Sequence, residues 1–142
     1  MRAVATIERK SDSGIYAQDS ILRFSEGLIG FSECKNFVLL ESEGISPFRR
    51  LQCVDRDDVG FLVLDPNIVV KDFSALVPER EWNAIGLKDP SERLAFVICI
   101  IGPSPTASTG NLQAPLIVNY TNMTGRQVIL SDSGLSSRQP LL

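Results

Sequence analysis

The residues best suited to chemistry in this sequence are carboxylates gathered between two apolar runs. Asp55, Asp57 and Asp58 stand close together, and a glycine follows two positions later. Paired carboxylates can act as a general acid and base, and Asp at the first and third positions with Gly at the sixth also begins a calcium loop. Val59 at the fifth position and Pro66 at the twelfth, where such a loop needs Glu, leave the ligand set incomplete. We therefore expect a solvated turn and no metal site.

The composition removes most other catalytic options. The 142 residues include no histidine, so the commonest general base and the commonest transition-metal ligand are both absent. A serine–lysine pair would need a lysine whose pKa is lowered by burial, and none of the four lysines lies in an apolar run: Lys10, Lys35, Lys71 and Lys88. Acidic residues in turns are usually solvated, which argues against a catalytic carboxylate pair. Such a pair could be drawn from Asp55, Asp57, Asp58, Asp65 or Asp72. We expect a protein that is not an enzyme and holds no cofactor.

Length and charge predict one cytoplasmic domain. A chain of this size buries about two-thirds of the surface that its unfolded form exposes. The longest apolar run is too short to cross a bilayer, and Met1–Lys10 has no apolar segment for secretion. The formal charge is −3 and no basic run exceeds the pair Arg49-Arg50, so a basic protein partner is expected and direct contact with nucleic acid or membrane is not. We expect a monomer.

The three cysteines predict buried thiols. Cys34, Cys53 and Cys99 are odd in number, widely spaced and mostly within apolar runs. A disulfide framework would need an even number at regular spacing, so reduced side chains that pack as small hydrophobes are expected.

Strands are predicted along most of the chain, and the central one is Leu94–Ile101. Its eight successive apolar residues lack the polar interruptions of a surface helix, so both faces of this strand should be buried. Leu116–Tyr120 should return beside it after a loop at 102–110. Pro47–Val54 and Gly60–Leu64 should pair as a hairpin across the acidic turn. Further strands are expected at Ser20–Phe24, Asn36–Glu41 and Gly125–Leu130, with short edge strands at Arg2–Ile7 and Ile68–Phe73.

One helix and one tight turn complete an all-β prediction. Pro78–Gly86 begins with proline and acids and ends with glycine, as helices do. Its Trp82 is expected in the core rather than in an aromatic cofactor site. Gly27 and Gly30 suit a turn with positive φ better than a phosphate-binding loop, since no Lys-Ser/Thr follows them. Residues 131–142 should form a loosely ordered tail.

Several ordered motifs resemble those of the FliW family, the flagellar assembly factors, over essentially the whole chain. They are Ile21-Leu22-Arg23-Phe24 with Glu26-Gly27-Leu28-Ile29-Gly30-Phe31, Pro47-Phe48 with Leu51-Gln52, Phe61-Leu62-Val63, Asp65-Pro66, Ser108-Thr109 with Asn111-Leu112-Gln113-Ala114-Pro115-Leu116-Ile117-Val118-Asn119, and Gly125-Arg126-Gln127-Val128-Ile129-Leu130. The resemblance implies a compact antiparallel β-barrel-like domain over residues 1–130 with one short helix. It also implies two protein partners, flagellin and CsrA, an RNA-binding repressor of flagellin translation. Flagellin that accumulates unsecreted would capture the FliW protein, and CsrA would then repress again. A small-ligand-binding β-barrel is the alternative, and it would require an apolar cavity.

We place the candidate partner surface on the acidic turn and on neighbours expected to be exposed. The six residues are Gln52, Asp55, Asp57, Asp58, Asp65 and Asn67. A second set of residues carries the family motifs and is expected to shape turns and packing or to make contacts. These residues are Phe24, Gly27, Gly30, Phe31, Asn111, Leu112, Ala114, Pro115 and Asn119.

Overall fold

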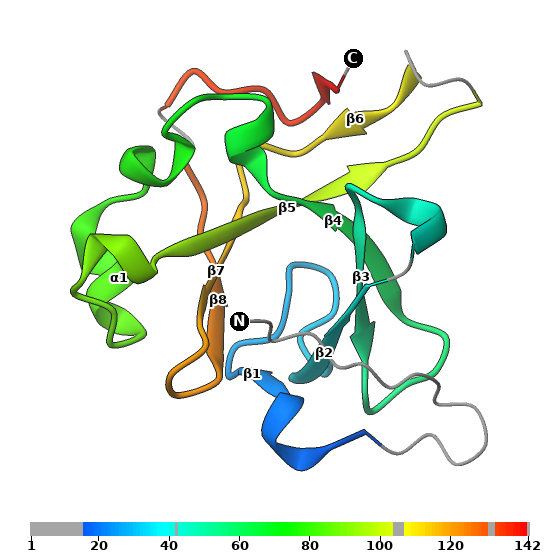
Figure 1. The fold of residues 1–142 in the computed structure, drawn as a ribbon, viewed down its shortest axis with the longest axis vertical. Coiled ribbons are helices and arrows are strands. Elements are labelled where there is room, and N and C mark those ends of the chain that lie inside the picture. Colours follow the sequence, from blue (N-terminus) through cyan, green and yellow to red (C-terminus); the bar gives the residue numbers. More distant parts are fainter. Residues whose placement is uncertain (1–15, 42, 104–106, 131–132, 142) are drawn as a thin grey trace.

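Strands dominate the computed structural model, which describes residues 16–41, 43–103, 107–130 and 133–141 (Figure 1). Seven of them close a barrel: β1 (Leu22–Phe24), β2 (Asn36–Leu40), β3 (Arg49–Cys53), β4 (Gly60–Leu64), β5 (Leu94–Ile100), β7 (Leu116–Asn119) and β8 (Thr124–Gln127). Two short strands extend the sheet beyond β5: β6 (Thr109–Gly110) and β9 (Gln139–Pro140). The all-β prediction is confirmed. The edge strand predicted at 2–7 lies outside the described residues.

The strand order around the barrel is β4-β3-β2-β1-β8-β7-β5, and pairing of β5 with β4 closes it. The predicted hairpin is confirmed, since Arg49 lies opposite Val63 and Gln52 opposite Gly60. All neighbours in the closed barrel are antiparallel except β1 and β8, which run parallel with Phe24 beside Gly125. That single parallel pair is a departure from the expected antiparallel order. It joins segments about a hundred residues apart in the sequence, for which no local turn could specify the pairing.

The edge strand predicted at 68–73 is wrong. This segment contains the end of the 3₁₀ helix η3 (Pro66–Ile68) and the start of η4 (Phe73–Leu76), and no described residue between them is in a strand. The Asp65 carboxylate accepts a hydrogen bond from the Asn67 backbone at 2.9 Å, and Asp72 adopts a left-handed φ of 57°. Local hydrogen bonding of this kind competes with strand formation. The remaining 3₁₀ turns are η1 (Gln18–Ser20), η2 (Glu43–Ile45) and η5 (Pro90–Glu92).

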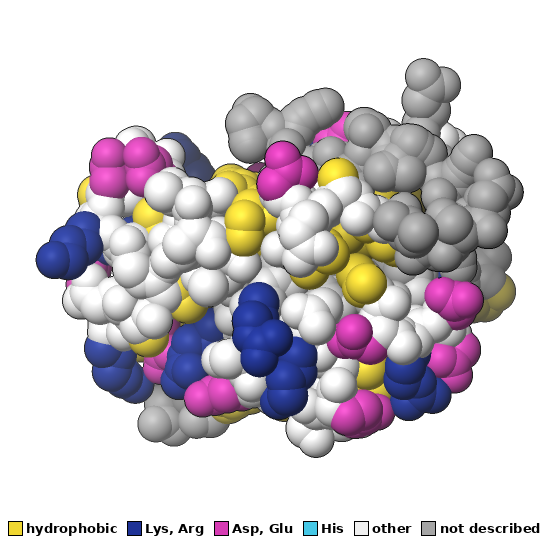
Figure 2. Space-filling view, turned by 90° about the horizontal axis from the view of Figure 1, so that it is seen from below, with side chains coloured by type: hydrophobic (Ala, Val, Ile, Leu, Met, Phe, Trp, Pro, Cys, Tyr) yellow, Lys and Arg dark blue, Asp and Glu magenta, His cyan; other side chains and the backbone are white. Residues whose placement is uncertain are grey.

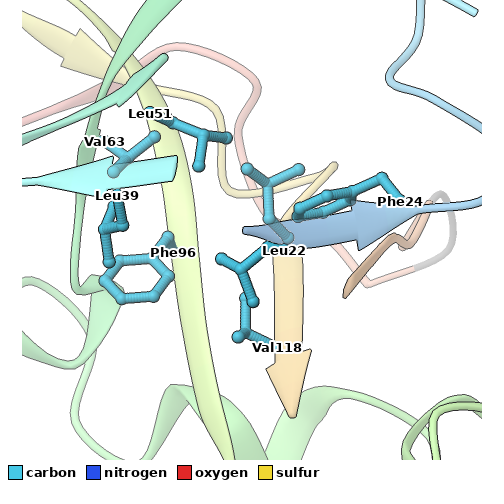
Figure 3. Close-up of a pocket in the computed structure, with 8 residues that line it drawn as sticks. Leu22, Phe24, Leu39, Leu51, Val63, Phe96 and Val118 are labelled. Atoms are coloured by element: carbon cyan, nitrogen blue, oxygen red, sulfur yellow. The ribbon is translucent and has the colours of Figure 1, made fainter. Parts of the chain in front are cut away.

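Inward-facing side chains fill the barrel. The residues that converge in Figure 3 come from six of its strands: Leu22, Phe24, Leu39, Leu51, Val63, Phe96, Leu116 and Val118. Together they leave no room for a water molecule among them. Small-ligand barrels enclose a cavity lined by such residues. The apolar cavity that a ligand-binding barrel requires is therefore missing from this part of the molecule.

A second core lies outside the barrel wall, under the segment that contains α1 (Glu79–Ala84). Trp82 of this helix is fully buried and packs with Phe73 against Val97 of β5. Phe96 of the same strand faces the barrel interior, so β5 is buried on both faces as predicted. The helix prediction and the core position of Trp82 are confirmed. Burial of so large a side chain is worth about 3 kcal/mol or more.

Glu79 anchors the first turn of α1 to the beginning of β5. Both of its carboxylate oxygens accept hydrogen bonds of 2.7 Å from Arg93, whose guanidinium group lies 5.2 Å from the centre of the Trp82 ring. The Arg93 side chain is only 8% exposed, and its hydrogen bonds hold the pKa of Glu79 below its ordinary value. A carboxylate whose pKa falls on folding stabilises the fold above the pKa of the unfolded chain, and this stabilisation is lost as the pH falls through the folded-state pKa.

We therefore expect Glu79→Gln to be less stable than the parent near neutral pH and to approach the parent as the pH falls below about 4. Urea unfolding at neutral and acidic pH measures the difference. A stability difference that stays constant over this range would contradict the role of the Glu79 charge.

Residues near the C-terminus join the second core. β9 pairs with β6, and the Leu112 backbone donates a 2.9 Å hydrogen bond to the Ser136 carbonyl. Leu141 packs against the second core and donates from its backbone to Ser108 at 3.1 Å. The described part of the segment expected to be a loosely ordered tail thus contributes a strand and a packed side chain.

Candidate binding surfaces

The acidic turn lies at the tip of the β3–β4 hairpin. Asp55, Asp57 and Asp58 are all exposed, while Val59 beside them is 5% exposed and packs into the barrel core. The Val59 backbone donates to the Arg56 carbonyl at 3.2 Å, which closes the turn. The prediction of a solvated turn is therefore confirmed at these three carboxylates.

Gln52 corrects one part of the predicted surface, because its side chain is 4% exposed rather than open to a partner. Its amide nitrogen lies 2.9 Å from the Val59 carbonyl, 3.1 Å from that of Cys53, and 3.3 Å from those of both Arg56 and Asp57. Its amide oxygen accepts from Arg50 Nε at 2.9 Å. A buried amide that serves several carbonyls holds a turn in one conformation. Gln52 therefore positions the acidic turn from beneath.

Arg56 organises the charges of the acidic turn. Its guanidinium group contacts both oxygens of Asp58, at 2.8 and 3.2 Å, and donates to Glu33 at 3.1 Å. The hydrogen bonds from Arg56 lower the pKa of Asp58, so this carboxylate stays ionised well into the acidic range. The four carboxylates of Glu33 and the three turn aspartates carry more charge than the single guanidinium group of Arg56, so this surface has a net negative charge.

Asp65 and Asn67 lie at the other end of β4 from the acidic turn. An extended strand of five residues places its ends about 15 Å apart. Asp65 Oδ1 accepts from both the backbone and the side-chain nitrogen of Asn67, at 2.9 and 2.8 Å, and so caps η3. The structure therefore brings Asp55, Asp57 and Asp58 together but separates them from this pair.

The motif residues of the first turn shape the backbone and the core. Phe24 is 1% exposed inside the barrel, and Phe31 packs edge-to-face on Phe61 with ring centres 5.3 Å apart. Gly27 has a φ of 70°, and a Cβ there would lie 2.7 Å from the Ser32 backbone. Only glycine fits such a site without strain. Gly30 also has a positive φ, of 86°, but has open space around it.

The second motif, which runs from Asn111 to Asn119, is also largely structural. Leu112 is fully buried, and Ala114 and Pro115 are buried too. Asn111 accepts a 3.0 Å hydrogen bond from the Gln113 backbone. Asn119 is 3% exposed and ties the end of α1 to the barrel, because its side chain donates to the Ile85 carbonyl at 2.7 Å. These contacts account for the motif residues through packing and backbone geometry.

A polar cleft of about 500 Å³ lies on the outer wall of the barrel, between the end of α1 and strands β1 and β8. Its lining comes from three distant segments: Arg23, Ser25, Glu26 and Gly27; Asn83, Ala84, Ile85 and Gly86; and Asn122, Thr124, Gly125 and Arg126. Sequence patterns do not predict this site, because the parallel β1–β8 pair that assembles it has no local signature. The alternation of exposed Arg23 between buried Leu22 and Phe24 was the only available signal.

Neither charge dominates the lower face of the molecule. Figure 2 shows Lys and Arg side chains interspersed with Asp and Glu side chains over this face. Nucleic-acid binding needs a continuous basic area. The described residues of this face do not form one.

The described part of the chain contains three cysteines. Cys34, Cys53 and Cys99 are free and buried as predicted, and burial raises the pKa of the Cys99 thiol to about 11. The described residues contain no group of three or more metal-ligating side chains, and none of the helices they form is long and apolar enough to cross a bilayer.

Comparison with known proteins gives a consistent result in both sequence and structure. Residues 7–141 match the model of the FliW family, described as FliW protein. The chain is 36% identical over 127 residues to the flagellar assembly factor FliW of Leptospira interrogans serogroup Icterohaemorrhagiae serovar Lai, covering 89% of this chain and 85% of the relative. It is 34% identical over 128 residues to the factor of the same name from Caldanaerobacter subterraneus subsp. tengcongensis, with coverage of 89% and 85%. A crystal structure of the flagellar assembly factor FliW superimposes with a TM-score of 0.82 at 28% identity, covering 98% of this chain and 96% of that one.

Proposed function

Because the chain belongs to the FliW family of flagellar assembly factors, we propose that it binds flagellin and, alternatively, the translational regulator CsrA in the cytoplasm. Binding to CsrA relieves repression of flagellin synthesis, and capture by unsecreted flagellin restores it. The match over residues 7–141 supports this proposal most directly. A binding role, without catalysis, also agrees with a chain that has no histidine.

We further propose that CsrA docks at the acidic turn. Three exposed aspartates gather at the tip of one hairpin, where Arg56 joins Glu33 to them, and Gln52 holds the backbone that carries the aspartates. An RNA-binding regulator presents positive charge, so a fixed acidic surface would steer its approach and orient it. Exposed charges act mainly on the association rate.

Reversing Asp57 and Asp58 to lysine is expected to slow association with CsrA about tenfold at low salt, with a smaller change at high salt. Stopped-flow or surface-based kinetics at two ionic strengths measures the effect. The matched control is Asp19→Lys with Glu92→Lys, which changes the net charge equally at exposed sites outside the turn. Equal slowing in both variants would assign the effect to net charge and refute docking at this turn.

The proposed function is tested by calorimetric titration of this protein with flagellin from the same organism, followed by competition with its CsrA. One-to-one binding of flagellin that displaces CsrA is the expected result. Absence of binding to either protein at micromolar concentration would refute the proposed function. Simultaneous binding of both would refute the alternation.

A further inference from the structure

The polar cleft beside α1 has no role in docking a basic protein at the acidic turn. It is lined by residues of β1 and the turn that follows it, of the end of α1, and of β8 and the turn before it. We propose that this cleft is a second binding site, which accepts an extended peptide segment with a carboxylate side chain from a protein partner. The inference goes beyond the proposed function and holds whichever protein supplies the segment.

Arg23 is the cation that selects a carboxylate. It lies in the middle of β1, where Leu22 and Phe24 point into the barrel and Arg23 points outward to the cleft. The described residues offer its side chain no hydrogen bond or ion pair, although the Arg23 backbone bonds to Met123. An arginine fork can bind a carboxylate through two parallel hydrogen bonds.

Arg126 provides a second cation that is held in place by the protein. Its Nε donates to Glu81 at 2.7 Å and its Nη1 to Glu26 at 3.2 Å. Glu81 is mostly buried, with a side chain 15% exposed, whereas the Glu26 side chain is 73% exposed at the cleft. Glu26 therefore competes with an incoming carboxylate for Arg126 and can swing into solvent when one arrives.

The rest of the lining suits a peptide backbone. Gly27, Gly86 and Gly125 line the cleft with backbone atoms. A side chain would narrow the cleft only at Gly86, because a Cβ at Gly27 or Gly125 would point toward the Ser32 backbone or the Phe24 ring. Asn83 places an amide group at the cleft that can both donate to and accept from a peptide, whereas the Asn122 amide already bonds to the Ile85 carbonyl and the Thr124 hydroxyl. The cleft volume of about 500 Å³ lies within the range of about 300–1,000 Å³ that is typical of ligand sites. A polyanion such as nucleic acid fits less well, because Glu26 and Glu81 both pair with Arg126 and leave Arg23 as the one cation of the cleft lining without an ion pair among the described residues.

The probe is an N-acetylated, C-amidated pentapeptide with glutamate between pairs of glycines, titrated into the full-length ¹⁵N-labelled protein. Its counterpart with glutamine is the matched ligand control. We expect the glutamate peptide to shift the amide signals of Gly27, Gly86 and Gly125 at millimolar concentration, while Gly60 at the acidic turn stays unchanged. Equal shifts with the glutamine peptide, or no shift at the cleft glycines, would overturn the proposal.

Two variants should change the affinity in opposite directions. Arg23→Gln is expected to weaken binding about fivefold, and Glu26→Gln to strengthen it two- to threefold because Arg126 loses a competitor. Lys71→Gln, which removes an exposed cation outside the cleft, should have no effect. Loss of affinity in the Lys71 variant equal to that in the Arg23 variant would reduce the effect to net charge and refute the site. The probe assay uses neither flagellin nor CsrA. The peptide can therefore fail to bind while the proposed function stands, and it can bind the cleft even if the proposed function is refuted.

Discussion

Replacing Gly125 with alanine is expected to destabilise the fold by about 3 kcal/mol, because the new methyl group would enter space that the Phe24 ring already fills. An ideal Cβ at Gly125 would lie 2.6 Å from Phe24 Cε2 and 2.7 Å from Cε1. The ring cannot easily move aside, since it packs edge-to-face on Phe37 with centres 5.5 Å apart inside a filled barrel. Denaturant unfolding measures the loss. Gly44→Ala, where a Cβ would meet open space, is the control and should change stability by less than about 0.5 kcal/mol.

A second substitution tests whether the clash with Phe24 is the cause. Phe24→Leu alone removes ring volume from the core and should cost about 2 kcal/mol. In the Gly125→Ala background the shorter side chain makes room for the methyl group. The double variant should therefore be more stable than the sum of the two single losses predicts, and the coupling energy should be at least about 1 kcal/mol. Strict additivity would show that Gly125 is required for another reason.

The Phe24–Gly125 contact also shows where sequence patterns stop predicting this fold. Buried strands such as β5 were predictable because successive apolar residues leave no polar face, and the β3–β4 hairpin because turn residues separate two apolar runs. The parallel pairing of β1 with β8 follows from neither signal. It depends on how side chains that are distant in the sequence pack in the closed barrel. The polar cleft that this pairing creates could not be predicted from the sequence for the same reason.

The candidate site was predicted only in part, because a side chain's type does not determine its exposure. The turn aspartates were correctly expected in solvent, since charged side chains are rarely buried without partners. Gln52 looked like their exposed neighbour, yet its amide is buried under the turn. Asp65 and Asn67 looked close to them along the chain, but one strand length separates the two groups. Local polarity was readable from the sequence, and the direction of each side chain was not.

Gln52→Leu is expected to destabilise the protein by about 2–3 kcal/mol, because it removes a buried amide whose two N–H groups serve the backbone carbonyls beneath the acidic turn. Leucine has nearly the same size and is apolar, so the loss is one of hydrogen bonds rather than of packing volume. The turn should also open more often. Amide hydrogen exchange at Cys53 and Val59, whose backbone N–H groups bond within the turn, should accelerate by more than the global loss of stability explains.

The matched control is Asn36→Ala, which removes an amide that reaches the same turn from outside. Asn36 Nδ2 lies 3.3 and 3.5 Å from the Asp55 carboxylate oxygens in an exposed position, so its loss should cost less than about 0.5 kcal/mol. Because Gln52→Leu leaves every charge of the turn in place, it also separates charge from rigidity in partner binding. If fixed geometry matters, CsrA should bind this variant more weakly although the net charge is unchanged. An unchanged affinity together with faster exchange at Val59 would show that the turn's charge alone governs docking.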